Sequence, residues 1–408
     1  MFFKAYSLRF YTFLIRISYL IILGCNSYLI TEVFGLSREI RFFVYIGLLL
    51  LLFFDLFKFR KKYHLTVNIM VIYILIFIYN ILNIAAGADF GRFFEDFKNS
   101  MLILILTYLV QDGDRFVFIF KPLMKWFVLV NFIIFTCLLL WPQLFLVFAP
   151  GTTDVLNSGT ISFRFSGTQF SPGISSYFFA VLMIYFYLLF NNDKKSSNIF
   201  FFFLCLIMGL GTLNRSFVVF GGIILLFIIL KNISIKSIVS YLLLFCIYRI
   251  SNFHLLDAYV DLISMRLFDE GFENRIEGAS GVLNSLTSYT TNITIFGHLI
   301  YLDGSMKILI NNVIEEPHIS YIFYNAAYGI LFTFLLYFLI YSKLFYYLRN
   351  MKLKGKWDSL TFCLVGLIFG ISEVIIFTPF FFLNIYIADR LLFFYSNAAE
   401  NCLVPLEN

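Results

Sequence analysis

The chain alternates long apolar runs with short polar connections along most of its length. Most runs are apolar on every side of a helix, and several approach the roughly 20 residues that a helix needs to cross a hydrocarbon core. The period-two alternation of a membrane β-barrel is absent, which leaves a helical bundle as the structure that satisfies its own backbone in lipid. The pattern predicts about twelve spans. They cover residues 11–30, 42–57, 65–85, 99–110, 126–148, 173–190, 199–212, 217–230, 237–250, 319–345, 358–378 and 380–396.

The composition favours the same class of protein. Of the 408 residues, 61% are hydrophobic, 21% are aromatic and only 13% are charged. A soluble globular domain does not need that much apolar surface. The run 11–30 follows a basic N-terminus but lacks a convincing small-residue cleavage site, so we predict a first span there and not a signal peptide. We therefore expect an all-α, polytopic membrane protein in which residues 1–408 form one integral-membrane domain.

Lysine and arginine recur in every second connection between the predicted spans. Examples are "KFRKK" at 58–62, "NNDKK" at 191–195 and "LRNMKLKGK" at 348–356. By the positive-inside rule these connections and both termini face the cytoplasm. The intervening connections then face outward, including an outer loop at 149–172 and a large periplasmic loop at 251–317. The net charge of +6 largely reflects the cytoplasmic clusters and does not indicate a nucleic-acid partner.

Cysteine and histidine give no sign of a metal site or a cofactor. Five of the six cysteines lie inside apolar runs, where they resemble small buried hydrophobic residues. The four histidines have no metal-binding spacing. We therefore predict no metal and no cofactor.

Four arginines lie on the predicted outer side, where the positive-inside rule does not explain them. They are Arg164, Arg215, Arg266 and Arg275.

Arg215 separates two apolar segments, 199–212 and 217–230, of about 14 residues each. At about 21 Å each is shorter than the roughly 30 Å hydrocarbon core, so the turn between them should dip below the outer surface. Arg215 and its neighbour Asn214 could meet an anion there, beside a helix N-terminus expected at Ser216. The alternative is an interfacial arginine that snorkels to lipid headgroups.

The stretch "SFRFSGTQFSPGISSYFF" at 162–179 places Arg164 three residues before Gly167, with Pro172 where the next span begins. Glycine and proline predict a structured turn at the start of a helix. An ordinary loop with an interfacial arginine is an equal alternative.

Two further segments carry candidate residues. Residues 274–286 have the pattern of an amphipathic helix with Arg275 near its start, although, taken alone, this segment favours a solvated loop arginine. His318 follows a proline suited to a first helical position, so it should lie in the first turn of the tenth span, next to Glu315 and Glu316. A lone interfacial histidine is more often structural than catalytic.

The order of these segments resembles the O-antigen ligase and polymerase superfamily. The resemblance covers roughly residues 150–345: an R-x-x-G turn before a span, a short helix pair split by an arginine, a large outer loop with "NRIEGASGVLNSLTSYTTNITIFGH", and then "EEPHISYIFYNAAYGIL". The family signature ends in a histidine, matched by His318, and continues into a span with a glycine, matched by Gly329. Ile319 stands where asparagine is common in the family.

This resemblance implies a GT-C-like bundle in the bacterial inner membrane, with its active site facing the periplasm. The implied reaction is metal-independent, inverting glycosyl transfer from an oligosaccharide linked to undecaprenyl diphosphate in the membrane lipid. By the resemblance, the diphosphate is held by Arg164, Arg215 and Arg275, and His318 activates the acceptor hydroxyl. Supporting roles for Glu315, Glu316 and Asn214, and binding of a chain-length regulator, stay open.

Three functions are compatible with this sequence. A polymerase that joins repeat units is favoured because the chain is compact and lacks an evident basic outer patch for a phosphorylated core. A ligase would instead deliver the polymer to lipid A core. A flippase for lipid-linked oligosaccharide also has about twelve spans, and Glu373 and Arg390 within spans keep it open, but its expected paired halves are not evident.

Overall fold

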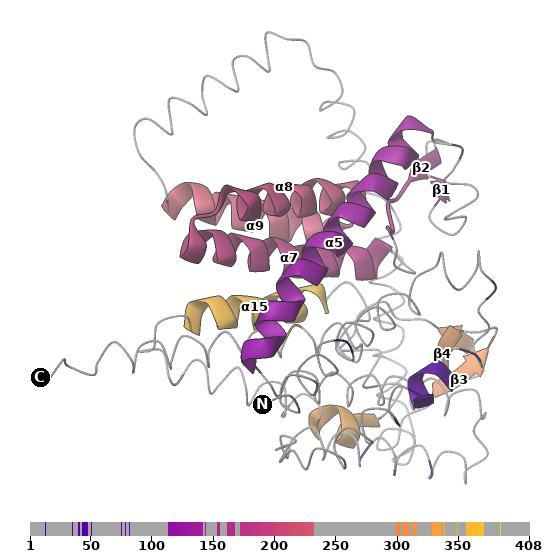
Figure 1. The fold of residues 1–408 in the computed structure, drawn as a ribbon. Helices are drawn as coiled ribbons and strands as arrows, with labels where there is room; N and C mark the ends of the chain where they lie inside the picture. The colour runs from indigo at the N-terminus through magenta and orange to yellow at the C-terminus, as the bar shows by residue number, and fades with distance from the viewer. Residues whose placement is uncertain are drawn as a thin grey trace, which may run out of the picture.

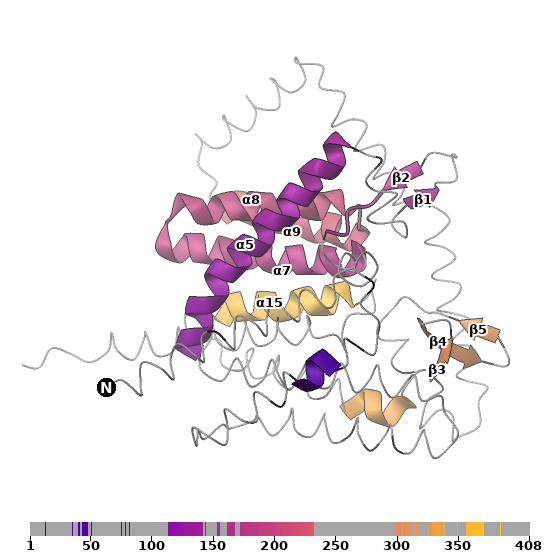
Figure 2. The ribbon, with the colours of Figure 1, turned by 45° about the vertical axis from the view of Figure 1, so that its right-hand side comes forward.

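The computed structural model describes residues 43–47, 113–141, 153–155, 161–167, 172–231, 299–302, 305–310, 313–315, 329–335 and 356–370, together with isolated positions elsewhere. Most of these residues are helical. The helices used below are α5 (Gly113–Leu140), α7 (Pro172–Asp193), α8 (Ser196–Gly211), α9 (Arg215–Lys231) and α15 (Lys356–Phe369). In both ribbon views α7, α8 and α9 lie side by side, α5 crosses them at an angle, and α15 lies along α7 (Figures 1 and 2).

α7 forms the centre of this helical block. It begins at Pro172, where the missing N–H and the fixed φ of proline suit a first helical position. Its residues from Tyr177 to Leu188 are all buried. They are covered by α8, α9 and α15, which pack against α7, and by α5, which contacts both α7 and α8. A helix that is apolar on every side has no polar face that needs water, so it can be surrounded by other helices on all sides.

Aromatic rings fill the contacts between these helices. Phe127 of α5 meets Phe178 of α7 edge to face at 4.9 Å, measured between ring centroids. Phe186 of α7 stacks on Phe201 of α8 at 5.2 Å. Such pairs contribute about 0.5–1.5 kcal/mol each beyond the area they bury. The phenylalanine-rich sequence therefore acts here as interhelical packing.

α7 and α8 are joined by a tight, basic turn. Lys194 adopts a left-handed backbone with φ 52°, and its N–H donates to the carbonyl of Phe190 at 2.8 Å, which closes the end of α7. Lys194 and Lys195 are both exposed. This is the "NNDKK" connection that the sequence predicts to be cytoplasmic.

One face of α5 is apolar and exposed. Trp126 is 68% exposed, and Ile133, two turns further on, is 60% exposed. Among the described residues, two helical stretches are long and apolar enough to cross a membrane, Lys121–Leu140 and Pro172–Asn191. Together with the outward apolar face, they indicate a membrane protein. Of the predicted spans before α5, the structure describes residues 43–47 and isolated positions. After α9 it describes parts of the predicted spans 319–345 and 358–378, whereas 237–250 and nearly all of 380–396 lie outside the described residues.

The predicted pair of short helices is present. α8 has 16 residues and α9 has 17, or about 24 and 26 Å of helix. Their boundaries differ from the predicted segments by up to three residues, and α9 begins at Arg215 and not at Ser216. The difference arises because Asn214, and not Arg215, occupies the capping position.

Two small antiparallel sheets accompany the helices within the predicted outer loops. β1 (Thr153–Val155) pairs with β2 (Ile161–Phe163), and β3 (Leu299–Leu302), β4 (Ser305–Ile310) and β5 (Val313–Glu315) pair in that order. The all-α prediction is confirmed for the packed helices of the described chain, whereas the two small sheets were not predicted. Leu302 pairs with Ser305 across the sequence Asp303-Gly304, a dipeptide typical of a two-residue hairpin.

Candidate functional site

The turn between α8 and α9 is buried. Thr212, Leu213 and Asn214 are each less than 7% exposed. The N–H groups of Thr212 and Leu213 donate to Gly209 and Leu210 at 3.2 and 3.0 Å, which ends α8 with a tight turn. Leu213 then takes a left-handed backbone with φ 51°, a conformation that L-residues other than glycine rarely adopt. The chain thus reverses direction inside the protein and not on its surface.

Asn214 starts α9 by capping it. Its side-chain Oδ1 accepts the N–H of Ser216 at 2.9 Å, and its carbonyl accepts the N–H of Val218 at 3.1 Å. Both bonds are those of an asparagine N-cap. Asn214, a predicted supporting residue of the site, therefore has a structural role that fixes where α9 begins.

Arg215 occupies the first position of α9 and is half-buried. A cation is unfavourable at this end of a helix, where the dipole is positive, and the first turn of α9 contains no acidic residue. A bound anion would gain from both the guanidinium and the helix N-terminus. The local electrostatics therefore favour an anion beside Arg215.

Arg164 reaches the same turn from the exit of β2. Its Nε donates to the carbonyl of Thr212 at 3.2 Å, and the N–H of Phe165 donates to the carbonyl of Gly211 at 3.0 Å. The last carbonyls of a helix lack intrahelical partners, and a cation is favourable beside them. Arg164 thus caps the negative end of α8 while Arg215 begins α9. The structure brings these two predicted arginines together at one turn.

The segment 164–167 is held in place from several helices. The Phe165 side chain is buried and lies edge to face with Phe135 of α5, with ring centroids 4.9 Å apart. The Ser175 hydroxyl of α7 donates to the carbonyl of Ser166. Gly167 adopts φ 59° and lies against the side chain of Asn131 in α5. The predicted R-x-x-G turn is therefore an ordered element, and its glycine is required by both conformation and space.

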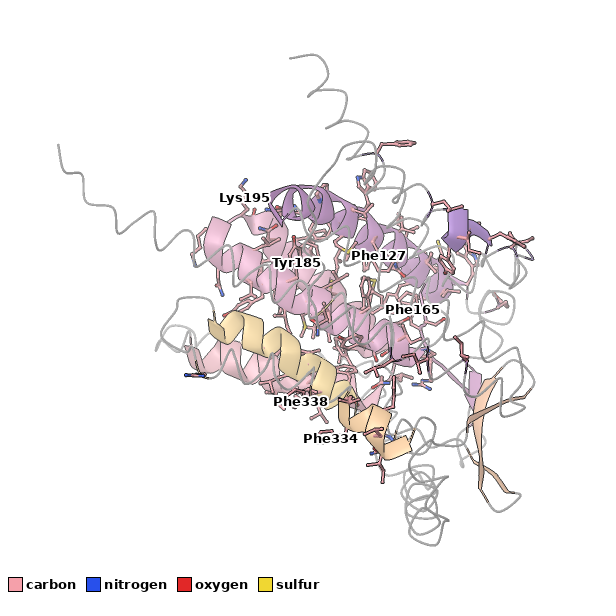
Figure 3. The ribbon with its side chains drawn as sticks, turned by 90° about the horizontal axis from the view of Figure 1, so that it is seen from below. Phe127, Phe165, Tyr185, Lys195, Phe334 and Phe338 are labelled. Atoms are coloured by element: carbon pink, nitrogen blue, oxygen red, sulfur yellow. The ribbon has the colours of Figure 1, made fainter. Side chains whose placement is uncertain are left out.

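Two turns lie at opposite ends of α7. One is the arginine turn, residues 212–214 between α8 and α9, to which Arg164 is bonded; the other is the lysine turn, Lys194 and Lys195 between α7 and α8. Phe165, next to Arg164 in the chain, and Lys195 are seen at opposite ends of the helical block (Figure 3). α7 has 22 residues, or about 33 Å of helix, which is close to the thickness of a hydrocarbon core. The two turns are therefore separated by about the thickness of one hydrocarbon core.

Two half-buried arginines at this buried turn suit a phosphate-bearing anion. Arginine stays charged and presents parallel N–H donors that match two phosphate oxygens. In the part of the chain that the structure describes, no group of three His, Cys, Asp or Glu side chains is placed to hold a metal ion.

The remaining predicted residues fall elsewhere. Arg275, Glu316 and His318 lie outside the described residues. Glu315 is the last residue of β5, where it pairs with Ile308 of β4, so its backbone belongs to a strand. Thr212 and Asn131 were not predicted, because an isolated threonine or asparagine in an apolar run gives no sequence signal of its partner.

No known protein family, curated protein or solved structure matches this chain.

Proposed function

We propose that this protein is a membrane glycosyltransferase that polymerises O-antigen or a related surface polysaccharide. The observation that carries the proposal is the hydrogen bond from Arg164 Nε to the carbonyl of Thr212, three residues before Arg215. It holds Arg164 at the turn from which Arg215 begins α9, and the resemblance assigns these two arginines, far apart in sequence, to the same ligand. A half-buried pair of arginines beside a helix N-terminus suits a diphosphate better than a single headgroup contact does.

The proposed reaction forms one glycosidic bond and breaks another. The hydroxyl oxygen of a lipid-linked repeat unit attacks the anomeric carbon of the donor glycan from the face opposite the diphosphate. The bond from that carbon to the diphosphate oxygen breaks, and undecaprenyl diphosphate leaves with the electron pair. In this scheme His318 takes the hydroxyl proton, and Arg164, Arg215 and Arg275 stabilise the charge that develops on the leaving group.

The site would work at the outer, periplasmic face of the bacterial inner membrane. The position of the exposed Lys194 and Lys195 turn, at the other end of α7, supports that orientation. The twelve-span GT-C-like bundle belongs to this proposal.

Polymerisation in vitro is the direct test. Purified protein in liposomes, given lipid-linked repeat units alone, should produce a ladder of longer glycans and release lipid diphosphate. Arg164→Ala and Arg215→Ala should lose most of this activity, whereas Lys194→Ala, at the opposite end of α7, should retain it. If glycan instead moves only to an added lipid A core acceptor, the protein is a ligase. Transport without release of lipid diphosphate would identify a flippase.

A further inference from the structure

Thr212 is the residue through which the two arginines are connected. Its carbonyl accepts the Nε–H of Arg164 at 3.2 Å. Its hydroxyl donates to the carbonyl of Gly209 at 2.6 Å and accepts the backbone N–H of Asn214 at 3.3 Å. The side chain is fully buried. One residue therefore takes part in the end of α8, the anchoring of Arg164 and the start of α9.

The two hydroxyl bonds constrain a turn that would otherwise be free to change shape. Thr212 has a right-handed helical backbone with φ −70° and ψ −16°, and Leu213 immediately switches to φ 51°. A left-handed leucine is disfavoured and persists only where its surroundings hold it. The bond from Asn214 to the Thr212 hydroxyl spans this residue, so it holds the left-handed step closed.

We propose that Thr212 is a positioning residue that sets the guanidinium of Arg164 relative to Arg215, so that both contact the diphosphate of the lipid-linked donor. This inference rests on the proposed function. Thr212 is buried and does not itself touch the donor. Its carbonyl aligns Arg164, and its hydroxyl, through Asn214, sets the first residue of α9. Loss of the hydroxyl should therefore alter the alignment of both arginines.

A simpler role for the hydroxyl can be separated by a matched control. Threonines in helices often donate to a carbonyl three or four residues earlier, with no further consequence. Thr136 of α5 does this, donating to Phe132 at 2.9 Å. Thr136→Val and Thr212→Val remove the same group with the same isosteric change. Only Thr212 also accepts the N–H of a helix cap.

The experiment measures binding of inorganic pyrophosphate by calorimetry, and the donor KM and kcat in the polymerisation assay. We expect Thr212→Val to weaken pyrophosphate binding by about 10-fold, since two hydrogen bonds are lost, and to raise the donor KM in proportion with a smaller change in kcat. Thr212→Ser keeps the hydroxyl and should stay within about 2-fold of the wild type. Thr136→Val should bind like the wild type. Thermal unfolding of each variant controls for loss of fold.

Several outcomes would overturn the inference. They are a Thr212→Val protein with wild-type binding and KM, an equal loss in Thr136→Val, or a failure of Thr212→Ser to restore binding. In an Arg164→Ala background, Thr212→Val should weaken binding by less than it does alone, because part of its effect passes through Arg164. If the losses of pyrophosphate binding in the two single variants simply add in the double variant, Thr212 does not act through Arg164.

Failure of the positioning role and failure of the proposed function give different results. If the wild-type protein neither binds pyrophosphate nor lengthens glycan, both the proposed function and the positioning role of Thr212 are wrong. If the wild-type protein lengthens glycan but the Thr212→Val variant has an unchanged donor KM, only the positioning role of Thr212 is wrong.

Discussion

Gly167 lies directly against the side-chain amide of Asn131, so that the turn after β2 meets α5 without space for a side chain. The Nδ2 of Asn131 donates to the carbonyl of Phe127 at 2.9 Å, which holds the amide in place. Gly167 also has φ 59°, in the left-handed region. Contact and conformation thus both require glycine three residues after Arg164.

Replacing Gly167 by alanine should destabilise the protein. The added Cβ would collide with the Asn131 amide, and alanine is strained at φ 59°, so we expect a loss of about 2–4 kcal/mol in the free energy of unfolding. Gly222→Ala is the matched control, because Gly222 lies in α9 with open space around it. That change should be neutral or stabilising by up to about 1 kcal/mol. Thermal unfolding in detergent measures both, and equal effects would contradict the contact.

Asn214 should affect stability and anion binding separately. Asn214→Ala removes the cap of α9 and should cost about 1 kcal/mol of unfolding free energy. Asn214→Asp keeps an oxygen to accept the Ser216 N–H and should restore that stability. It also places a negative charge beside Arg215, so pyrophosphate binding should weaken. If Asn214→Asp bound pyrophosphate as well as the wild type, no anion site would lie at this turn.

Lysine should not support pyrophosphate binding in place of Arg164 or Arg215. A lysine at position 164 offers one ammonium group, which cannot both reach the Thr212 carbonyl and bind two phosphate oxygens in parallel. We expect Arg164→Lys and Arg215→Lys to weaken pyrophosphate binding by about 10-fold or more. Calorimetry on protein at equal expression gives the values. Normal affinity and normal polymer length in both variants would refute bidentate binding.

His318 should be needed for chemistry and not for donor binding. His318→Ala and His318→Gln should each lower turnover by about 10²–10⁴-fold, because the acceptor hydroxyl loses its base. Pyrophosphate affinity should be retained. Near-normal turnover of His318→Gln would show that histidine only hydrogen-bonds the substrate.

The orientation of the chain is testable by cysteine labelling. Single cysteines at Ser280, in the large loop, and at Lys195, in the lysine turn, should differ in access to a membrane-impermeant maleimide. We expect Ser280→Cys to react in cells whose inner membrane is intact, and Lys195→Cys to react only after that membrane is opened. The reverse pattern would place the arginine site in the cytoplasm.

Local sequence signals predicted much of this region. The break at "TLNRS", the two short helices and the turn at Gly167 each depend on a few neighbouring residues: a cap, a positive φ or a proline at a first helical position. Such preferences act over one or two turns of chain, so they are visible in sequence. The sequence between the paired residues Leu302 and Ser305 carried a similar local signal, within a loop that the all-α prediction left without strands.

Only the tertiary structure determined which elements meet. α5 and α7 are both apolar on every side in sequence, yet α7 is buried and α5 exposes Trp126 and Ile133. Hydropathy reports the cost of exposure to water and not the identity of the neighbour, so it cannot separate contact with lipid from contact with protein. The meeting of Arg164 with Thr212 likewise depends on two carbonyls left open at the end of α8. Those carbonyls could be satisfied by any donor that packing brings near, and only the folded chain places Arg164 there.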